Sequence, residues 1–336
     1  MAFAGTGKIW MNGSMVDWQD ATIHVASHAL HYGTGVFEGL RAYDSTSGTN
    51  VFRLEPHMRR LIDSCRIYRM EPRWSQAELS QAVLDTVRIN GFKSCYIRPL
   101  VYRGYEQLGL DPRPCPVDAS IIVWEWSQMM GAGALEAGID VGVSSWTRLA
   151  PNTLPALAKG TANYANSGLI KMQASLDGYD EGIALDESGL LSEGSGQNLF
   201  LVRDGVIHTP SLGSSVLQGI TRESVLTIAK DLGYEVRETS LPREFLYLAD
   251  EAFFCGTAVE ITPIRSIDKI TVGNGKRGPI TEALQQRFFG ILRGELPDAH
   301  GWLTPTAAGA ATFAEDRVDK PVCAPAFAET SARQGR

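Results

Sequence analysis

The sequence predicts an α/β protein of the α+β type, folded into two domains. Its 336 residues exceed what one hydrophobic core usually supports and are comfortable for two domains. A hydrophobic content of 44% with a charged content of 21% is typical of a soluble globular protein. Strand and helix patterns alternate irregularly along the chain, and this favours mixed sheets over a strict β–α–β winding.

The first half contains short local signals for strands, turns and helices. Asn12-Gly13 is a dipeptide that tight hairpin turns prefer. Apolar residues recur at helical spacing over 56–68, just after a proline. Ser75 and Glu78 form a capping-box pattern at the start of a second helix. We therefore expect a hairpin over 8–18, helices over 56–68 and 75–91, and buried strands over 95–102 and 119–126.

The second half begins after a stretch rich in glycine and alanine. A hairpin should turn at Asp204-Gly205, and Thr221 should cap the helix that follows it. Further strands are expected over 140–146, 234–241 and 251–257, and helices over 221–233 and 279–292. The predicted division is a flexible N-terminus (1–7), a smaller α/β domain (8–126), an interdomain loop (127–138), a larger domain (139–304) and a disordered tail (305–336).

Charge and cysteine content exclude several classes of protein. A net charge of −7 argues against nucleic-acid binding, which needs a basic face. The five cysteines are scattered without a CxxC pair, so neither a disulfide framework nor a zinc ribbon is predicted. The sequence shows no secretory signal and no apolar run of membrane-spanning length. We expect a cytoplasmic protein that binds neither membranes nor nucleic acid.

Two motifs suggest other functions, and both have simpler explanations. Gly273, Gly275 and Gly278 have the GxGxxG spacing of dinucleotide-binding proteins. Too little chain follows for the remaining β–α–β units, so a solvent-facing turn is favoured. His24, His28 and His31 could lie on one helical face as metal ligands, but no carboxylate base accompanies them. A structural role is favoured for these histidines, and no metal is expected.

Lys159 is the only charged residue in a long stretch of small and apolar residues between Arg148 and Lys171. One interpretation is a lysine at the start of a helix, with its ammonium group in solvent. The other is a partly desolvated lysine whose amine attacks a carbonyl. The second interpretation requires an aldehyde cofactor, for which pyridoxal 5′-phosphate is the usual choice.

Pyridoxal phosphate needs a carboxylate for its ring nitrogen, a phosphate cradle and a group near its phenolic oxygen. Glu193 lies between leucine and glycine residues beside a predicted strand. Residues 219–221 begin a predicted helix, where free N–H groups and the helix dipole favour an anion. A second small-residue turn lies at 256–258, and Tyr164 lies five residues after Lys159. Taken singly, each feature is more often an ordinary turn.

Seven motifs follow one another along the chain, namely HALHYGTGVFEGLR, HMRRL, CYIRPLVY, APNTLPALAKGTANY, LSEGSGQNLF, GITRESV and CGTAVEITP. Together they resemble the branched-chain amino-acid aminotransferases, of fold type IV of the pyridoxal-phosphate enzymes. The resemblance extends from about Lys8 to Trp302. It implies a smaller N-terminal α/β domain and a larger domain with a mixed-sheet pseudobarrel.

The resemblance assigns roles to the cofactor-binding residues. Lys159 would be the Schiff-base lysine and then move a proton between the substrate Cα and the cofactor C4′. Phosphate binding falls to Arg60 rather than Arg59, between which the helical pattern does not choose. The implied cofactor-binding residues are Arg60, Lys159, Tyr164, Glu193, Leu217, Ile220, Thr221, Gly256 and Thr257.

The resemblance also implies a substrate site. Tyr32, Phe37 and Trp126 would form an apolar pocket, with Leu110 reaching in from a second subunit. Such pockets discriminate by about 1–3 kcal/mol per methylene, so leucine, isoleucine and valine should all be accepted. Arg98 would bind the γ-carboxylate of glutamate. The implied substrate-binding residues are Tyr32, Phe37, Gly39, Tyr96, Arg98, Leu110, Trp126, Met129, Thr257 and Ala258.

Met129 departs from the family pattern, which often has a tyrosine there. A thioether donates no hydrogen bond, so we hypothesise a softer pocket that favours hydrophobic donors. A Met129→Tyr variant with unaltered glutamate and phenylalanine kinetics would refute this hypothesis.

The predicted activity is ping-pong transamination between L-Leu, L-Ile or L-Val and 2-oxoglutarate by at least a dimer. Within the fold, D-amino acid aminotransferases, (R)-amine transaminases and aminodeoxychorismate lyases are alternatives. A dehydrogenase built on the glycine motif and a metal hydrolase built on the histidines are alternatives from other classes.

Overall fold

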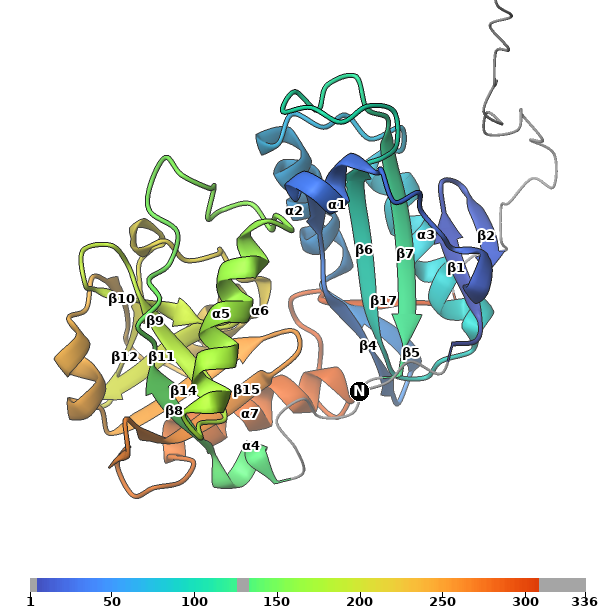
Figure 1. Ribbon diagram of the computed structural model, residues 1–336. Helices are drawn as coiled ribbons and strands as arrows, with labels where there is room; N and C mark the ends of the chain where they lie inside the picture. Colours follow the sequence, from blue (N-terminus) through green and yellow to red (C-terminus); the bar gives the residue numbers. More distant parts are fainter. Residues whose placement is uncertain (1–4, 126–132, 308–336) are drawn as a thin grey trace, which may run out of the picture.

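The computed structural model describes residues 5–125 and 133–307. These residues form two lobes, each built around one β-sheet (Figure 1). The first lobe holds the strands from β1 to β7, and the second holds those from β8 to β16. The last strand, β17 (Leu303–Pro305), returns to the first lobe and pairs with β5 (Gly48–Phe52).

The sheet of the first lobe is antiparallel, in the order β17-β5-β4-β6-β7-β1-β2, with β3 beside β6. Helices α2 and α3 bury Met58, Leu61 and Val83 against it, and these side chains form one core with Ile97 and Ile121 of the sheet. The remaining elements of this lobe are β1 (Lys8–Met11), β2 (Ser14–Asp17), η1 (Trp18–Asp20), α1 (His28–Tyr32), β3 (Gly35–Phe37), β4 (Leu40–Ser45), α2 (Leu54–Ile67), α3 (Gln76–Asn90), β6 (Cys95–Arg103) and β7 (Val117–Trp124).

The sheet of the second lobe is mixed, in the order β10-β9-β8-β15-β14-β11-β12-β13, with β16 beside β15. Helix α5 contacts β8 and β9, while α6 and α7 contact β14 (Figure 1). The elements of this lobe are α4 (Ala134–Ala137), β8 (Ile139–Val143), α5 (Asn163–Leu176), β9 (Glu181–Leu185), β10 (Leu191–Gly194), β11 (Asn198–Arg203), β12 (Val206–Pro210), η2 (Leu212–Ser214), α6 (Ile220–Asp231), β13 (Val236–Thr239), η3 (Arg243–Leu248), β14 (Glu251–Gly256), β15 (Glu260–Ile267), β16 (Ile270–Thr271) and α7 (Pro279–Leu292).

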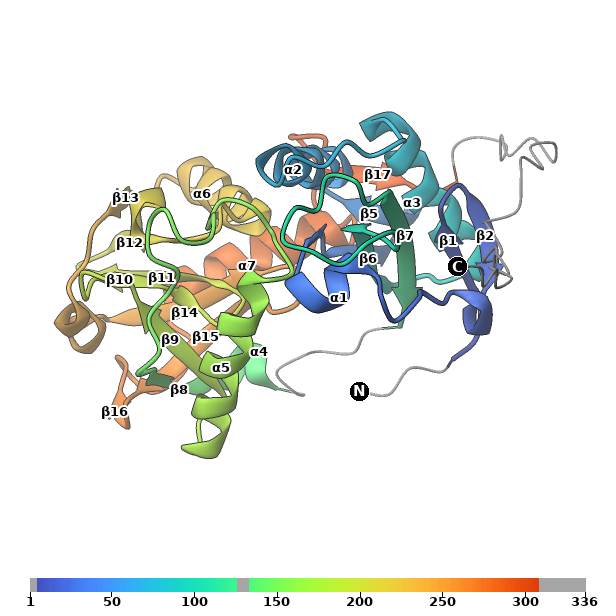
Figure 2. The same cartoon turned by 45° about the horizontal axis from the view of Figure 1, so that its top comes forward.

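A third apolar cluster joins the two lobes. Phe52 of β5 packs edge-on against Phe288 of α7 and Trp302, with ring centroids 5.5 and 5.8 Å apart. The same cluster contains Phe200 and Phe253 from the second sheet. Burying aromatic side chains from both lobes in one cluster fixes the lobes relative to each other. Figure 2 shows α7 running between them.

Most of the local sequence signals are confirmed. Both hairpins turn where expected, since Asn12 and Asp204 have φ angles of 51° and each precedes a glycine with positive φ. The capping box of Ser75 and Glu78 is present, and Gly91 ends that helix in the left-handed conformation. The mixed sheet and the two-lobed fold agree with the predicted fold class.

Two details of the sequence analysis are wrong. Thr221 does not cap α6, because Gly219 occupies the cap position and Thr221 is buried within the first helical turn. The predicted tail begins too early, since Pro305 belongs to β17 and the Thr306 N–H donates to the Thr49 carbonyl oxygen at 3.0 Å. Residues 308–336 of that tail lie outside the described residues. The other domain limits stay a prediction.

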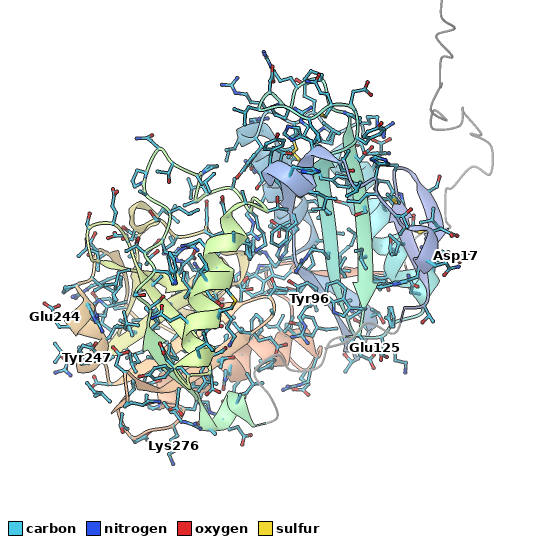
Figure 3. All side chains as sticks on the ribbon, viewed as in Figure 1. Asp17, Tyr96, Glu125, Glu244, Tyr247 and Lys276 are labelled. Carbon is cyan, nitrogen blue, oxygen red and sulfur yellow. The ribbon has the colours of Figure 1, made fainter. Side chains whose placement is uncertain are left out.

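The glycine-rich motif forms a turn, as predicted. Gly273 and Gly275 have φ angles of 51° and 74°, and the turn connects β16 to α7. Lys276 lies at the outer edge of the second lobe (Figure 3).

Within residues 5–125 and 133–307, no helix is long and apolar enough to cross a membrane.

The three histidines have structural partners. His28 is fully buried, and its Nε2 lies 2.7 Å from the Gly109 carbonyl oxygen, while His31 Nε2 lies 2.9 Å from the Val25 carbonyl oxygen. His24 packs against Tyr105. In the described part of the chain, no cluster of His, Cys, Asp or Glu could hold a metal ion.

Candidate active site

A cavity of about 340 Å³ lies between the two lobes, within the range of small-molecule sites. Its walls come from β3 and β6 of the first lobe and from α5, β10, α6 and the β14–β15 turn of the second. Tyr96 lies on the side of the first lobe that faces the second (Figure 3). The cavity is lined by Lys159 and by fourteen other residues predicted from the sequence, namely Phe37, Gly39, Arg60, Tyr96, Arg98, Tyr164, Glu193, Leu217, Ile220, Thr221, Gly256, Thr257 and Ala258, together with Gly219 from the expected phosphate turn.

Lys159 lies just before α5, where two hydrogen bonds between its backbone and the first lobe hold it. Its carbonyl oxygen accepts from the Phe37 N–H at 3.0 Å, and its own N–H donates to Ser64 Oγ at 3.1 Å. The Lys159 Nζ atom lies 2.6 Å from Tyr164 Oη. The amine also lies 5.1 Å from the centre of the Phe37 ring. The lone lysine is therefore a half-buried amine between aromatic rings, and the interpretation as a solvent-facing residue is not supported.

Glu193 lies on β10 at the opposite wall, with its carboxylate buried. Oε1 accepts from Arg148 Nη2 at 2.8 Å, while Oε2 accepts from Asn198 Nδ2 at 2.9 Å and from the Leu217 N–H at 3.1 Å. Burial raises the pKa of Glu193, and Arg148 and the Leu217 N–H oppose that rise. Every one of these partners donates, so the site is built for an ionised carboxylate that can accept a further N–H.

A phosphate-sized anion could be held at the start of α6. Gly219 is the cap residue and supplies no side-chain hydrogen bond, and Ile220 and Thr221 line the cavity. The first N–H groups of a helix have no partner within the helix, so an anion in the cavity can accept from them. A Cβ on Gly219 would collide with Asn198 Oδ1, so glycine is required where the chain passes so close to Asn198. The turn containing Thr257 lies on the same cavity.

Arg60 enters the cavity from α2, and its guanidinium is fixed by the buried Glu38 and by a backbone carbonyl. Nε and Nη2 donate to the two oxygens of Glu38 at 2.6 and 2.8 Å, while Nη1 donates to the Gln218 carbonyl oxygen at 2.8 Å. Glu38 is fully buried and also accepts from His57 Nδ1 at 2.7 Å. Burial alone would raise the pKa of Glu38, but Arg60 and His57 overcome this effect and hold it well below its usual range. Arg59 instead pairs with Asp63 in solvent.

The first-lobe wall carries a guanidinium among aromatic rings. Arg98 lies 4.6 Å from the centre of the Phe37 ring and 5.4 Å from that of Tyr96. Within the described residues, its buried Nε has no hydrogen-bond partner. A Cβ on Gly39 would collide with Tyr96 Oη, so only glycine leaves that hydroxyl in place. This arrangement suits a carboxylate beside an apolar side chain.

Two predicted substrate residues do not line this cavity, and two more cannot be placed in it. Tyr32, at the end of α1, and Leu110 are 42% and 88% exposed and do not line the cavity of their own chain. Trp126 and Met129 lie outside the described residues.

Sequence analysis missed four residues that hold the site together, namely Arg148, Asn198, Glu38 and His57. Arg148 and Glu193 are 45 residues apart, and their pairing has no local pattern. Glu38 and His57 lie within motifs that were recognised, GVFEGLR and HMRRL, but neither motif indicates that the two side chains meet. The signal available in the sequence was a glutamate inside a glycine-containing motif.

Residues 35–267 match the family described as amino-transferase class IV. A branched-chain-amino-acid aminotransferase of Salmonella typhimurium is 54% identical over 298 residues, which cover 88% of this chain and 96% of the relative. The chain belongs to the branched-chain-amino-acid aminotransferases of class IV.

Solved structures of branched-chain aminotransferases have the same fold. The Escherichia coli enzyme superposes with a TM-score of 0.88 at 53% identity, covering 90% of this chain and 99% of that one. The Thermobaculum terrenum enzyme, solved in its form with pyridoxal phosphate, gives a TM-score of 0.84 at 35% identity, with 90% and 99% coverage. The recognised family, the fold type and the cofactor class predicted from the sequence are thereby confirmed.

The donors and acceptors of this branched-chain aminotransferase fit pyridoxal phosphate. The three hydrogen-bond partners of the Glu193 carboxylate are all donors, and its oxygens can accept one more hydrogen bond, from a protonated ring nitrogen. The unpaired N–H groups at the start of α6 and the fixed guanidinium of Arg60 suit a phosphate. Lys159 and Tyr164 meet at hydrogen-bond distance, where the aldehyde carbon and phenolic oxygen require an amine and a hydroxyl.

Proposed function

We propose that this aminotransferase reversibly transfers the amino group between L-leucine, L-isoleucine or L-valine and 2-oxoglutarate. The observation that supports this most strongly is the convergence of Lys159, Tyr164 and the buried Glu193 on one cavity with a guanidinium among aromatic rings. The relatives that match about nine-tenths of this chain are named for branched-chain amino acids. Among the alternatives within the fold, an enzyme for D-amino acids or chiral amines is not favoured.

Pyridoxal phosphate, when bound, accepts the electron pair released as the substrate Cα–H bond breaks. Lys159 Nζ takes the Cα proton, because it is the basic group at this end of the cavity. Tyr164 Oη, 2.6 Å away, orients the amine and shares its proton. Glu193 holds the ring nitrogen protonated, and Arg148 and Asn198 keep its carboxylate in place. Arg60 and the N–H groups of α6 hold the phosphate.

Substrate recognition divides between two walls of the cavity. We assign the α-carboxylate to the N–H groups of the turn at Thr257 and Ala258, which line the cavity on the second lobe. Phe37 and Tyr96 contact the aliphatic side chain, and Arg98 receives the γ-carboxylate of glutamate between them. One cavity can thus take an apolar and an acidic side chain in the two half-reactions.

We further propose that the enzyme acts as a dimer in which Leu110 and Tyr32 complete the partner's substrate pocket. Apolar side chains are exposed around α1 and the 104–116 loop, and the bond from His28 to the Gly109 carbonyl oxygen joins these two segments. An exposed apolar group of this kind is typical of protein interfaces. It includes Val25, Leu30, Tyr32, Leu108 and Leu110. Sedimentation of the holoenzyme as a monomer would refute this.

The visible absorbance of the purified holoenzyme tests the activity. A band of the lysine-bound cofactor should bleach with L-leucine and return with 2-oxoglutarate. Lys159→Ala should lose this cycle, whereas Lys230→Ala, at an exposed position on α6, should retain it. A band that ignores L-leucine but responds to a D-amino acid would overturn the proposed substrate, and the absence of any band after reconstitution would overturn the cofactor role of Lys159.

A further inference from the structure

The turn proposed to bind the substrate α-carboxylate is a three-residue connection between β14 and β15. Gly256 and Glu260 are the last paired residues of the two strands, and Thr257, Ala258 and Val259 lie between them. Thr262 Oγ1 donates to the Val259 carbonyl oxygen at 2.6 Å and ties the turn to the sheet. Three-residue hairpin connections commonly place the next residue in the left-handed region, which favours glycine.

Glu260 occupies this left-handed position although it carries a side chain. Its φ angle is +55°, and the residue is buried. A non-glycine residue in this conformation is strained and persists only where surrounding contacts hold it. The contacts of the Glu260 side chain therefore indicate why glutamate stands where glycine would be easier.

The Glu260 carboxylate is held by two residues of the other lobe. Arg41 Nη1 lies 3.2 Å from Oε1, and Tyr43 Oη donates to the same oxygen at 3.1 Å. Both partners lie on β4, 217 residues or more before Glu260 in the chain. The Arg41 guanidinium lies 5.4 Å from the centre of the Tyr43 ring, so the partly buried Arg41 and Tyr43 form one cluster with the buried Glu260.

The same strand positions the other wall of the substrate site. Arg41 pairs directly with Tyr96 in the β4–β6 register, and Tyr96 lines the cavity beside Arg98. Arg41, Tyr43 and Glu260 do not themselves line the cavity. Because they lie off the cavity wall, any effect on the reaction passes through the turn and through Tyr96.

We propose that Glu260, clamped by Arg41 and Tyr43, is a positioning residue that fixes the Thr257 and Ala258 N–H groups at a set distance from Tyr96 and Arg98. The inference rests on the proposed function, because it assigns the substrate α-carboxylate to this turn. It adds that the affinity for that carboxylate is set by an ion pair between the lobes. Amino acids and 2-oxo acids share the α-carboxylate, so both depend on the cluster equally.

The test compares Glu260→Gln and Tyr43→Phe with the wild-type holoenzyme. Glu260→Gln keeps the size of the side chain and removes its charge, whereas Tyr43→Phe removes one hydrogen bond. Binding of 4-methylvalerate, an aliphatic carboxylate without an amino group, is followed through the cofactor absorbance. We expect binding about tenfold weaker in Glu260→Gln, matching the loss of one charge-assisted contact, and a smaller loss in Tyr43→Phe.

The kinetic pattern separates positioning from general damage. The KM values for leucine and 2-oxoglutarate should rise by the same factor in Glu260→Gln, while kcat stays within about twofold of wild type. Unaltered binding of 4-methylvalerate in both variants would overturn the inference, and so would a loss confined to one substrate. If Glu260→Gln fails to fold, Tyr43→Phe decides alone, with wild-type affinity counting against the inference. A wild-type enzyme that ignores leucine would instead overturn the proposed function.

Discussion

The buried carboxylate of Glu38 should control both the stability of the protein and its affinity for pyridoxal phosphate. The two oxygens accept from Arg60 Nε, Arg60 Nη2 and His57 Nδ1 at 2.6, 2.8 and 2.7 Å, and Glu38 is fully buried. Glu38→Gln replaces one acceptor oxygen with an NH₂ group that faces a donor. The largely buried Arg60 guanidinium then loses its counter-ion, which lowers the free energy of unfolding by about 3 kcal/mol.

Thermal unfolding of the apoenzyme and titration with pyridoxal phosphate measure the two effects. A loss of about 3 kcal/mol lowers the unfolding midpoint by about 4 °C in a chain of this size. Because Glu38 aims the guanidinium, the affinity for pyridoxal phosphate should also fall about tenfold. Glu55→Gln is the matched control, since Glu55 is exposed on α2, the helix that carries Arg60. Among the described residues its side chain accepts one hydrogen bond, from Gln76 Nε2. A Glu38→Gln enzyme with the wild-type midpoint and affinity would refute the reasoning.

The stabilisation by Glu38 should depend on pH in a defined direction. Its pKa in the folded protein lies well below the ordinary value, because Arg60 and His57 outweigh the effect of burial. A lowered folded pKa contributes stability that is present above the unfolded pKa, about 4.3, and is lost as pH falls toward the folded value. The difference in unfolding free energy between wild type and Glu38→Gln should therefore be constant from pH 7 to pH 5 and smaller at pH 3. A difference that grows on acidification would contradict this.

Two further variants test the site. Arg148→Met removes the charge that opposes the burial-induced rise in the Glu193 pKa, so that pKa should rise further. Activity, which needs ionised Glu193, should then be lost at a higher pH as the solution is acidified; an unmoved acid limb of the single-turnover rate would exclude this role. Gly39→Ala places a Cβ against Tyr96 Oη and should raise the KM for leucine at least severalfold without changing the affinity for pyridoxal phosphate. Equal kinetics in Gly39→Ala and wild type would show that Tyr96 is not part of the substrate wall.

Local chemistry explains why much of the fold was predictable. The Asn12-Gly13 and Asp204-Gly205 turns and the Ser75–Glu78 capping box involve residues within a few positions of one another, and each formed as expected. The exception is instructive. Threonine is a good helix cap, yet Thr221 lies within the first turn, because its place on the cavity wall is decided by the packing of α6.

The sequence alone was sufficient to predict the family and the cofactor class, and it indicated Lys159 as the candidate Schiff-base lysine. Lys159 stands alone among small residues, within one of seven ordered motifs. Which side chains meet follows from the packing of the two lobes: Arg148 with Glu193, Glu38 with Arg60 and His57, and Glu260 with Arg41 and Tyr43. Turn and cap preferences act over a few residues. These pairs depend instead on how the two sheets pack across the cavity, and no local sequence pattern encodes that packing.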